Sequence, residues 1–286
     1  MLAPVEVPFR LVDVFAPAPF SGNPLCVVPD AADLDPATMQ ALAAEIGFSE
    51  STFVTAAAGD RYSVRIFMPD REIPFAGHPT LGTAFVLAAM GRIASVATQV
   101  VAAGEVPVEV DLAAASAAMT QPATVFGPEV RDRASIAAAL GIPEAALHPD
   151  LPPRVVSTGH PPLLVPLVDA AAVASIAPDA RHVEPTCRAS GAEELYAFAV
   201  VDRRDGTTIA DARYVGFGAV AEDAATGSAA GPLGAYLADR GVATRLLVRQ
   251  GAHLGRPSEL RVDATDPGRV RVAGSVRPVA EGAFRI

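Results

Sequence analysis

A polar turn that runs directly into an apolar helix carries several side chains suited to chemistry. It spans Glu222–Pro232 and contains Asp223, Thr226, Gly227 and Ser228. Backbone N–H groups in the first turn of a helix have no intrahelical partner, and the positive end of the helix dipole favours a negative group. We expect this turn to bind a carboxylate or another small anion. The alternative is that Thr226 or Ser228 serves only as the N-cap of the helix.

A second turn of the same kind lies in the first half of the chain. Pro74–Thr80 includes Gly77 and His78 and also leads into an apolar run. Gly77 lies 150 positions before Gly227, which places His78 opposite Ser228 in a repeat. Two such helix starts, one from each half, are suited to gripping a small acid from both sides.

Glu50 is the first candidate for general acid–base work. It follows a predicted helix end at Gly47 and precedes an apolar strand, between Phe48 and Phe53. A carboxylate between aromatic rings loses hydration, which suits it to proton transfer. The alternatives are a solvated glutamate at a strand edge for Glu50 and a plain turn or cap residue for Asp223.

Residue spacing excludes three familiar kinds of site. A P-loop needs lysine after its last glycine, but Gly227 is followed by Ser228. A hydrolase elbow needs glycines two residues on either side of the serine, where this chain has Thr226 and Ala230. A zinc site needs clustered ligands, and the histidines show neither an i, i+4 pair nor cysteine neighbours: His78, His148, His160, His182 and His253.

Charge, apolar runs and cysteine positions limit the kinds of partner and the cellular location that we expect. A net charge of −10 argues against a nucleic-acid partner, which requires clustered lysine and arginine. No apolar run reaches the length of about 18 residues that a membrane span needs. Cys26 and Cys187 lie in unrelated contexts and are expected to be buried and reduced. The first ten residues lack the features of a signal peptide, which favours a cytoplasmic location.

Strands dominate the expected elements. Asp35 and Pro36 mark the start of a helix that ends at Gly47, while Thr80–Met90 and Ala229–Ala238 are helices that are apolar on most sides. The expected strands are 9–14, 25–28, 51–55, 62–67, 154–157, 163–167, 194–201, 208–214, 246–249, 259–262, 269–272 and 282–286. An apolar helix must be surrounded by protein, so we expect a curved sheet around a central helix in each half.

An internal duplication fits this order of elements. Gly22-Asn23-Pro24 in the first half matches Gly159-His160-Pro161 in the second, and each precedes an apolar strand. Thr120–Glu129 is the candidate linker. The expected domains are residues 1–122, carrying Glu50 and His78, and residues 123–286, carrying Asp223 and Ser228, with the last strand able to return to the first half.

The chain resembles the phenazine-biosynthesis PhzF-like family, which has the diaminopimelate-epimerase fold. The matching motifs occur in family order across nearly the whole chain: Val12-Asp13-Val14-Phe15, Pro19-Phe20-Ser21-Gly22-Asn23-Pro24, Ser49-Glu50-Ser51-Thr52-Phe53-Val54, Gly77-His78-Pro79-Thr80, Glu222-Asp223, Ala225–Pro232, Gln250-Gly251 and Gly255-Arg256-Pro257-Ser258. The resemblance implies an α+β fold of two pseudo-symmetric domains, each a strongly curved, mostly antiparallel sheet or barrel wrapped around a central helix.

The resemblance also implies roles for individual residues. Glu50 matches the family's catalytic acid/base, while His78 and Asp223 match residues that line the site and orient the substrate. The expected substrate-binding residues are Gly77, Gly227, Ser228, Asn23 and Thr226. No metal or organic cofactor is implied, and the expected assembly is a homodimer.

Two departures from the family pattern concern the loop that carries Asp223. Ala224 stands where the family usually has proline after the aspartate, and Tyr214–Phe217 replaces an apolar-Phe-Ala-Pro stretch. The loop is therefore expected to have its own shape, which bears on the substrate.

The function expected from these residues is a cofactor-independent isomerase or epimerase that moves a proton on a small carboxylate or amino-acid-like substrate. One alternative is a non-catalytic protein of the same fold that binds small acids. A hydrolase with Ser228 as nucleophile is disfavoured by its spacing.

Overall fold

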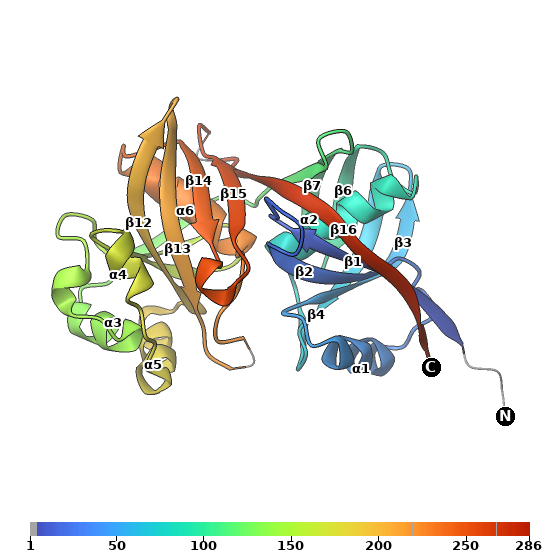
Figure 1. Ribbon diagram of the computed structural model, residues 1–286, viewed down its shortest axis with the longest axis horizontal. Helices are drawn as coiled ribbons and strands as arrows, with labels where there is room; N and C mark the ends of the chain where they lie inside the picture. Colours follow the sequence, from blue (N-terminus) through green and yellow to red (C-terminus); the bar gives the residue numbers. More distant parts are fainter. Residues whose placement is uncertain (1–4, 219, 267) are drawn as a thin grey trace. The chain divides into compact units, whose positions relative to one another are not determined.

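The computed structural model describes residues 5–218, 220–266 and 268–286. The chain divides into two compact units. Unit 1 comprises the residues up to Thr120 together with Ala273–Ile286, and unit 2 comprises Gln121–Val272. Each unit is built around its own helix, which Figure 1 labels α2 in unit 1 and α6 in unit 2.

Unit 1 is a closed barrel. Its strands are β1 (Glu6–Val14), β2 (Asn23–Val28), β3 (Ser51–Ala58), β4 (Arg61–Phe67), β5 (Glu72–Ile73), β6 (Val96–Val101), β7 (Gly104–Asp111), β8 (Ser116–Thr120) and the long β16 (Arg271–Arg285). They pair in the order β1-β2-β3-β4-β6-β7-β8-β16, with β5 beside β4. Pairing of β16 with β1 closes the ring. A closed barrel leaves no unpaired edge among these strands.

Helix α2 (Gly77–Ala89) is the core of unit 1, because every residue from Gly77 to Ala88 is buried. It packs closely on β1 and β2. A Cβ added at Gly82 would lie 2.5 Å from Leu25 Cδ2 and 2.9 Å from Val14 Cγ2, so the contact requires glycine there. Helix α1 (Pro36–Ile46) packs with β2 and β3 in a separate apolar cluster.

Unit 2 repeats the architecture. Its strands are β9 (Val125–Glu129), β10 (Arg154–Ser157), β11 (Pro162–Pro166), β12 (Glu194–Arg204), β13 (Thr207–Val215), β14 (Arg245–Gln250) and β15 (Ser258–Asp263). They pair in the order β15-β14-β13-β12-β11-β10-β9. Its helices are α3 (Arg133–Leu140), α4 (Ala170–Ala174), α5 (Ala180–Ser190) and the buried α6 (Gly227–Asp239), with short 3₁₀ turns at Glu144–Ala146 and Ala252–Leu254.

The two units share one pairing pattern. In unit 1, strands β1-β2-β3-β4-β6-β7 pair successively as antiparallel, parallel, antiparallel, parallel and antiparallel. In unit 2, strands β10-β11-β12-β13-β14-β15 follow the same succession. The central helix precedes the fifth strand in both, and it begins at Gly77 or Gly227 and has 13 residues. The expected fold of two pseudo-symmetric halves, each wrapped around a helix, is confirmed.

The predicted bounds of individual helices and strands agree with the structure to different degrees. Helix α1 has the predicted bounds, with Asp35 as N-cap and Gly47 as a left-handed C-cap. The two central helices start earlier than predicted, and α2 has Pro79 in its first turn, where proline removes no helical hydrogen bond. The segments predicted as separate strands at 269–272 and 282–286 both overlap one strand, β16. A bulge beside Pro278 lets the proline lie within it.

The segment predicted as a linker, Thr120–Glu129, contains strand β9.

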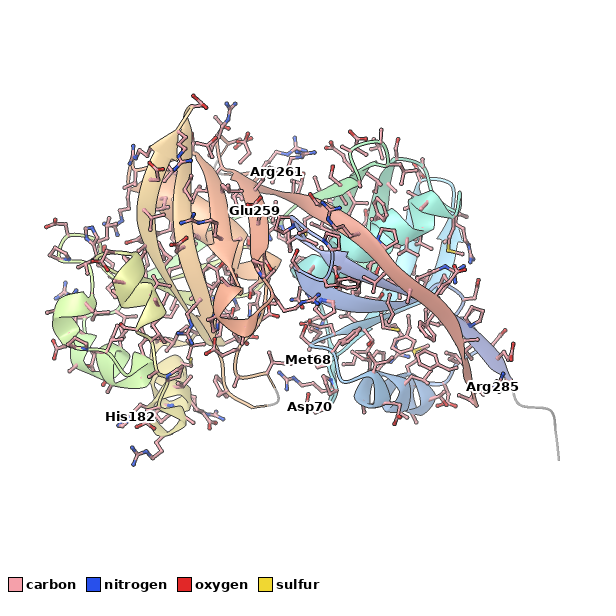
Figure 2. The ribbon with its side chains drawn as sticks, in the orientation of Figure 1. Met68, Asp70, His182, Glu259, Arg261 and Arg285 are labelled. Carbon is pink, nitrogen blue, oxygen red and sulfur yellow. The ribbon has the colours of Figure 1, made fainter. Side chains whose placement is uncertain are left out.

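Strand β15 shows how inward and outward side chains alternate in unit 2. Ser258, Leu260 and Val262 are buried, while Glu259 and Arg261 are exposed (Figure 2). Within the described residues, no helix is long and apolar enough to cross a membrane.

Candidate active site

The starts of the two central helices differ from those of the other α-helices that the structure describes. Helices α1, α3, α4 and α5 all begin with an aspartate whose carboxylate accepts a backbone N–H of the first turn: Asp35, Asp132, Asp169 and Asp179. Helix α2 has Ala76 as N-cap and α6 has Thr226, and neither makes a side-chain cap hydrogen bond. Thr226 is thus the N-cap residue of α6, as the alternative expected, but its side chain accepts from no backbone N–H of the first turn. Both helix starts therefore keep the character of anion sites.

His78 occupies the second position of α2 and is almost fully buried. Its Nδ1 lies 3.2 Å from Nδ2 of Asn23, and the Ser49 hydroxyl donates to the Asn23 side-chain oxygen at 3.3 Å. The oxygen of Asn23 accepts from Ser49, so its amide nitrogen faces the ring. Burial lowers the pKa of His78 to about 3, so the imidazole is neutral near pH 7.

Glu50 lies at the start of β3, directly beside this group. Its carboxylate Oε2 is 3.6 Å from Nδ1 of His78, and its side chain is 16% exposed. Phe53, three residues on, is buried in an apolar cluster against which Phe48 packs. Three sequence-predicted residues of unit 1, namely Asn23, Glu50 and His78, are thus brought together at the start of α2, which begins at Gly77.

A buried polar chain anchors this helix start, and the sequence analysis did not identify it. The Tyr62 hydroxyl donates to the Gln99 side-chain oxygen at 3.0 Å, and the Gln99 amide donates to Thr80 Oγ1 at 2.8 Å. Thr80 in turn donates to the Ala76 carbonyl at 2.8 Å. A signal was present, because Ala97, Gln99 and Val101 alternate with more exposed residues and place a glutamine on the inward face of β6.

Unit 2 brings its own predicted residues together at the start of α6. The Thr226 hydroxyl donates to Asp223 Oδ2 at 2.6 Å. The Gln121 side chain donates to the Gly227 carbonyl at 2.8 Å and accepts from the Thr158 hydroxyl at 2.7 Å. Ser228 follows Gly227 in the first turn and is half-buried. Gln121 and Thr158 were not identified from the sequence.

Helix α6 accommodates Gln121 only because residue 231 is glycine. A Cβ at Gly231 would lie 1.6 Å from the Gln121 side-chain oxygen. The loop before α6 is held as well. The Glu222 carboxylate forms an ion pair with Arg213 and a hydrogen bond with His253. Arg213 also donates to the Ile176 carbonyl at 2.8 Å. Asp223 therefore follows a residue that is fixed on both sides.

A second histidine in unit 2 has the opposite electrostatic setting from His78. His160 Nε2 bonds the carboxylate of Glu194, which is 1% exposed, and Nδ1 lies 3.1 Å from Glu193. Burial works against protonation, but the charges and hydrogen bonds of Glu194 and Glu193 outweigh it and raise the pKa of His160 to about 10. The ring is therefore an imidazolium at neutral pH.

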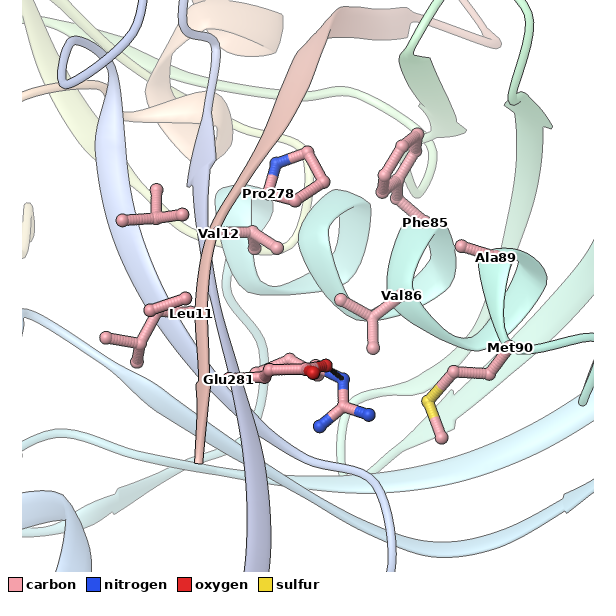
Figure 3. Close-up of a pocket in the computed structure, with 11 residues that line it drawn as sticks. Leu11, Val12, Phe85, Val86, Ala89, Met90, Pro278 and Glu281 are labelled. Atoms are coloured by element: carbon pink, nitrogen blue, oxygen red, sulfur yellow. Dashed lines mark ion pairs between the residues drawn. The ribbon is translucent and has the colours of Figure 1, made fainter. Parts of the chain in front are cut away.

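A cavity of about 390 Å³ lies elsewhere in unit 1, near the C-terminal end of α2. Figure 3 shows side chains of α2, β1 and β16 around it: Phe85, Val86, Met90, Leu11, Val12 and Pro278. An ion pair joins Arg10 Nε and Glu281 Oε2 at 3.1 Å, and both residues line the cavity. The cavity does not include Glu50 or His78, which lies at the N-terminal end of the helix.

Comparison with known proteins identifies the family. The phenazine biosynthesis-like protein family matches residues 12–282. A trans-2,3-dihydro-3-hydroxyanthranilate isomerase from Pseudomonas fluorescens is 35% identical over 280 residues, which cover 93% of this chain and 95% of the relative. The solved structure of a predicted epimerase from Pseudomonas aeruginosa is 34% identical, with a TM-score of 0.83, over 97% of this chain and 99% of that one.

Other solved structures share the fold of this chain at much lower sequence identity. A hydroxyproline epimerase from Agrobacterium vitis has a TM-score of 0.62 at 12% identity, over 98% of this chain and 93% of that one. The resemblance read from the motifs and the expected enzyme class, an isomerase of the PhzF type, are confirmed by these comparisons. The chain belongs to the phenazine biosynthesis-like protein family.

Proposed function

We propose that this chain is a cofactor-independent isomerase or epimerase that moves a proton on a small carboxylate or amino-acid-like substrate, with Glu50 as general acid/base. One observation carries the proposal. The carboxylate of Glu50 lies 3.6 Å from the neutral, buried imidazole of His78, at a helix start that has no side-chain cap. A base, an oriented hydrogen-bonding ring and an anion-binding helix start are the parts that such a reaction needs.

Each half contributes to the proposed chemistry. The uncapped starts of α2 and α6, at Gly77 and Gly227–Ser228, bind the substrate carboxylate through backbone N–H groups. Glu50 removes a proton from carbon and returns it to the same molecule. Asp223 and His78 hold an amino or hydroxyl group and stabilise the charge that develops.

The first substrate to test is the one in the name of the Pseudomonas fluorescens relative, trans-2,3-dihydro-3-hydroxyanthranilate. It is a small amino acid that carries a hydroxyl group, which matches the groups assigned to the carboxylate-binding helix starts and to Asp223. Ala224 and Tyr214–Phe217 depart from the family pattern beside Asp223. A panel of amino and hydroxy carboxylates therefore accompanies this compound.

The decisive variant is Glu50→Gln, which keeps the size of the side chain and removes its base. We expect solvent-deuterium incorporation into the substrate to fall by a factor of about 10² to 10⁴. Glu45→Gln is the matched control, because Glu45 is an exposed carboxylate of α1 that has no role in the proposal. Undiminished exchange in Glu50→Gln would show that Glu50 is not the base.

The same assay distinguishes catalysis from binding alone. If the wild-type chain binds members of the panel by calorimetry but exchanges no carbon-bound proton, it is a non-catalytic small-acid binder. We further propose that the protein is a cytoplasmic homodimer. Light scattering coupled to size-exclusion chromatography tests the dimer, and a monomeric mass at micromolar concentration would contradict it.

A further inference from the structure

The side chain of Gln250, the last residue of β14, is buried and has all four of its hydrogen-bonding positions occupied. Its oxygen accepts from the Tyr196 hydroxyl at 2.7 Å and from the backbone N–H of Thr226 at 3.2 Å. Its nitrogen donates to the Asp223 carbonyl and to Thr226 Oγ1, both at 2.9 Å. A fully satisfied buried amide has one orientation, because rotation by 180° would set donors against donors.

This orientation decides where the Thr226 hydroxyl points. A threonine hydroxyl has a single proton to donate, and Thr226 Oγ1 already accepts from Gln250. Its proton is therefore directed at Asp223 Oδ2, which lies 2.6 Å away. Gln250 thus acts on the carboxylate of Asp223 through Thr226, and on the backbone of Asp223 directly.

The neighbouring backbone keeps the glutamine and the turn in contact. Gly251 has a φ of 76°, and a Cβ there would lie 2.4 Å from both the Ala224 and the Arg256 carbonyl oxygens. Only glycine allows this approach at a positive φ. The turn Asp223–Thr226 is consequently packed against Gln250-Gly251 by main-chain contacts as well as by the amide.

Unit 1 contains a similar chain of hydrogen bonds, from a tyrosine through a glutamine to a threonine, but it ends on a different acceptor. Gln99 accepts from the Tyr62 hydroxyl at 3.0 Å and donates to Thr80 Oγ1 at 2.8 Å. The Thr80 hydroxyl, however, donates to a main-chain carbonyl, that of Ala76. The buried tyrosine–glutamine–threonine chain thus supports a helix start in both halves, and in unit 2 alone it ends on a carboxylate.

We propose that Gln250 is a positioning residue for the reaction. It fixes the direction of the Thr226 hydroxyl and thereby the orientation of the Asp223 carboxylate toward the substrate. The inference rests on the proposed function, which gives Asp223 its contact with substrate. It assigns to the end of β14 a role in catalysis that is exerted entirely through Thr226 and Asp223.

The test uses Gln250→Glu in the full-length protein. Glutamate keeps the size and both acceptor positions but loses both donors, so the Thr226 hydroxyl turns toward the new carboxylate and away from Asp223. We expect kcat for trans-2,3-dihydro-3-hydroxyanthranilate, or for the fastest substrate of the panel, to fall at least tenfold. Gln99→Glu, which makes the same chemical change in unit 1, is expected to lower the unfolding midpoint in urea similarly with a smaller loss of kcat.

A double-mutant cycle with Asp223→Asn separates positioning from general destabilisation. If Gln250 acts through Asp223, adding Gln250→Glu to Asp223→Asn lowers kcat by less than twofold. Additive losses would overturn the inference. Full activity of Asp223→Asn would instead contradict the role given to Asp223 in the proposed function.

A measurement without substrate completes the test. Amide hydrogen exchange of residues 224–228 is expected to become at least tenfold faster in Gln250→Glu and to stay unchanged in Gln99→Glu. Unchanged exchange in Gln250→Glu would show that the amide does not hold the turn, and would overturn the proposal whatever the substrate is.

Discussion

Asn23 and His78 fix each other at the start of helix α2: the amide nitrogen of Asn23 lies 3.2 Å from Nδ1 of the buried imidazole. Ser49 holds the amide in this orientation by donating to its oxygen. The histidine is neutral because it is buried, and its ring is held next to the carboxylate of Glu50. Its part in the proposed chemistry is that of an oriented hydrogen-bonding group, because its pKa of about 3 leaves it without a charge at neutral pH.

Replacing Asn23 with aspartate should make the imidazole of His78 easier to protonate. A carboxylate beside Nδ1 favours the imidazolium, so we expect the pKa of His78 in Asn23→Asp to rise by about 2 units or more. The imidazole NMR signals, followed between pH 4 and 9, measure it. Asn23→Ala is the control that removes the amide without adding charge and should leave the pKa low. An imidazole that is still neutral at pH 4 in Asn23→Asp would contradict the contact between residue 23 and Nδ1 of His78.

The low pKa of His78 also predicts weaker folding in acid. Because the pKa falls from 6.5 in the unfolded chain to about 3 in the folded one, the unfolded chain binds more protons between these values. The free energy of unfolding should therefore decrease as the pH falls below 6.5, by up to about 1.4 kcal/mol per pH unit from this residue. Urea unfolding at pH 7 and pH 5 should show a smaller difference in His78→Gln than in the wild type.

His160 predicts a loss of stability at the other end of the pH range. Its pKa is raised to about 10, so the folded chain binds the extra proton between pH 6.5 and 10. The contribution is fully present below pH 6.5 and is lost as the pH rises toward 10. His160→Gln should remove this dependence and, by leaving Glu194 buried without its cation, cost about 3 kcal/mol at pH 7. Adding Glu194→Gln should restore part of that loss, and no restoration would sink the explanation.

Gly22 is expected to tolerate no side chain. Its φ is 74°, and an added Cβ would lie 2.4 Å from the Val14 carbonyl oxygen. Gly22→Ala should lower the free energy of unfolding by roughly 2 kcal/mol or more, through left-handed backbone strain and a main-chain clash. Urea denaturation measures the loss. Gly59→Ala, which shares a positive φ of 63° but meets no atom within 4 Å, separates the strain from the clash.

The two cysteines should be chemically silent in the folded chain. Cys26 and Cys187 are buried free thiols, and burial raises the pKa of each to about 12. A thiol reagent at pH 8 should label neither until the chain unfolds. The double variant Cys26→Ala, Cys187→Ala should keep deuterium exchange within a factor of about 3, since neither thiol takes part in the proposed chemistry. A loss comparable to that of Glu50→Gln would show that a thiol takes part in the reaction.

Local sequence signals predicted the elements whose ends carry their own chemistry. Asp35-Pro36 and Gly47 bound α1 at the predicted residues, because a cap is specified by its own side chain and backbone. The apolar runs after Gly77 and Gly227 predicted both central helices and their repeat. Strand β16 was predicted only near its two ends. Pro278 lies between them, and the pairing with β1 across a bulge accommodates this proline within the strand.

The sequence predicted the residues of the candidate site but not the side chains that hold them in place. Glu50, His78 and Asp223 were each found from a short motif of neighbouring residues. Gln250 and Thr226 are 24 residues apart, and Gln99 and Tyr62 are 37 apart, so their hydrogen bonds depend on strand register. Register is a property of the whole barrel and not of a short segment. The alternation in β6 and β14 shows that these glutamines face inward but does not reveal their partners.

Because of the long strand β16, the two units are completed at different times during synthesis. Unit 2 is one continuous stretch, Gln121–Val272, so it is complete once Val272, the second residue of β16, has emerged. Unit 1 holds most of its barrel from the start, yet the strand that joins β8 to β1 is added after all of unit 2. Until then β1 and β8 are open edges on the nascent chain. The half that carries Glu50 is therefore the first to be begun on the ribosome and the last to be completed.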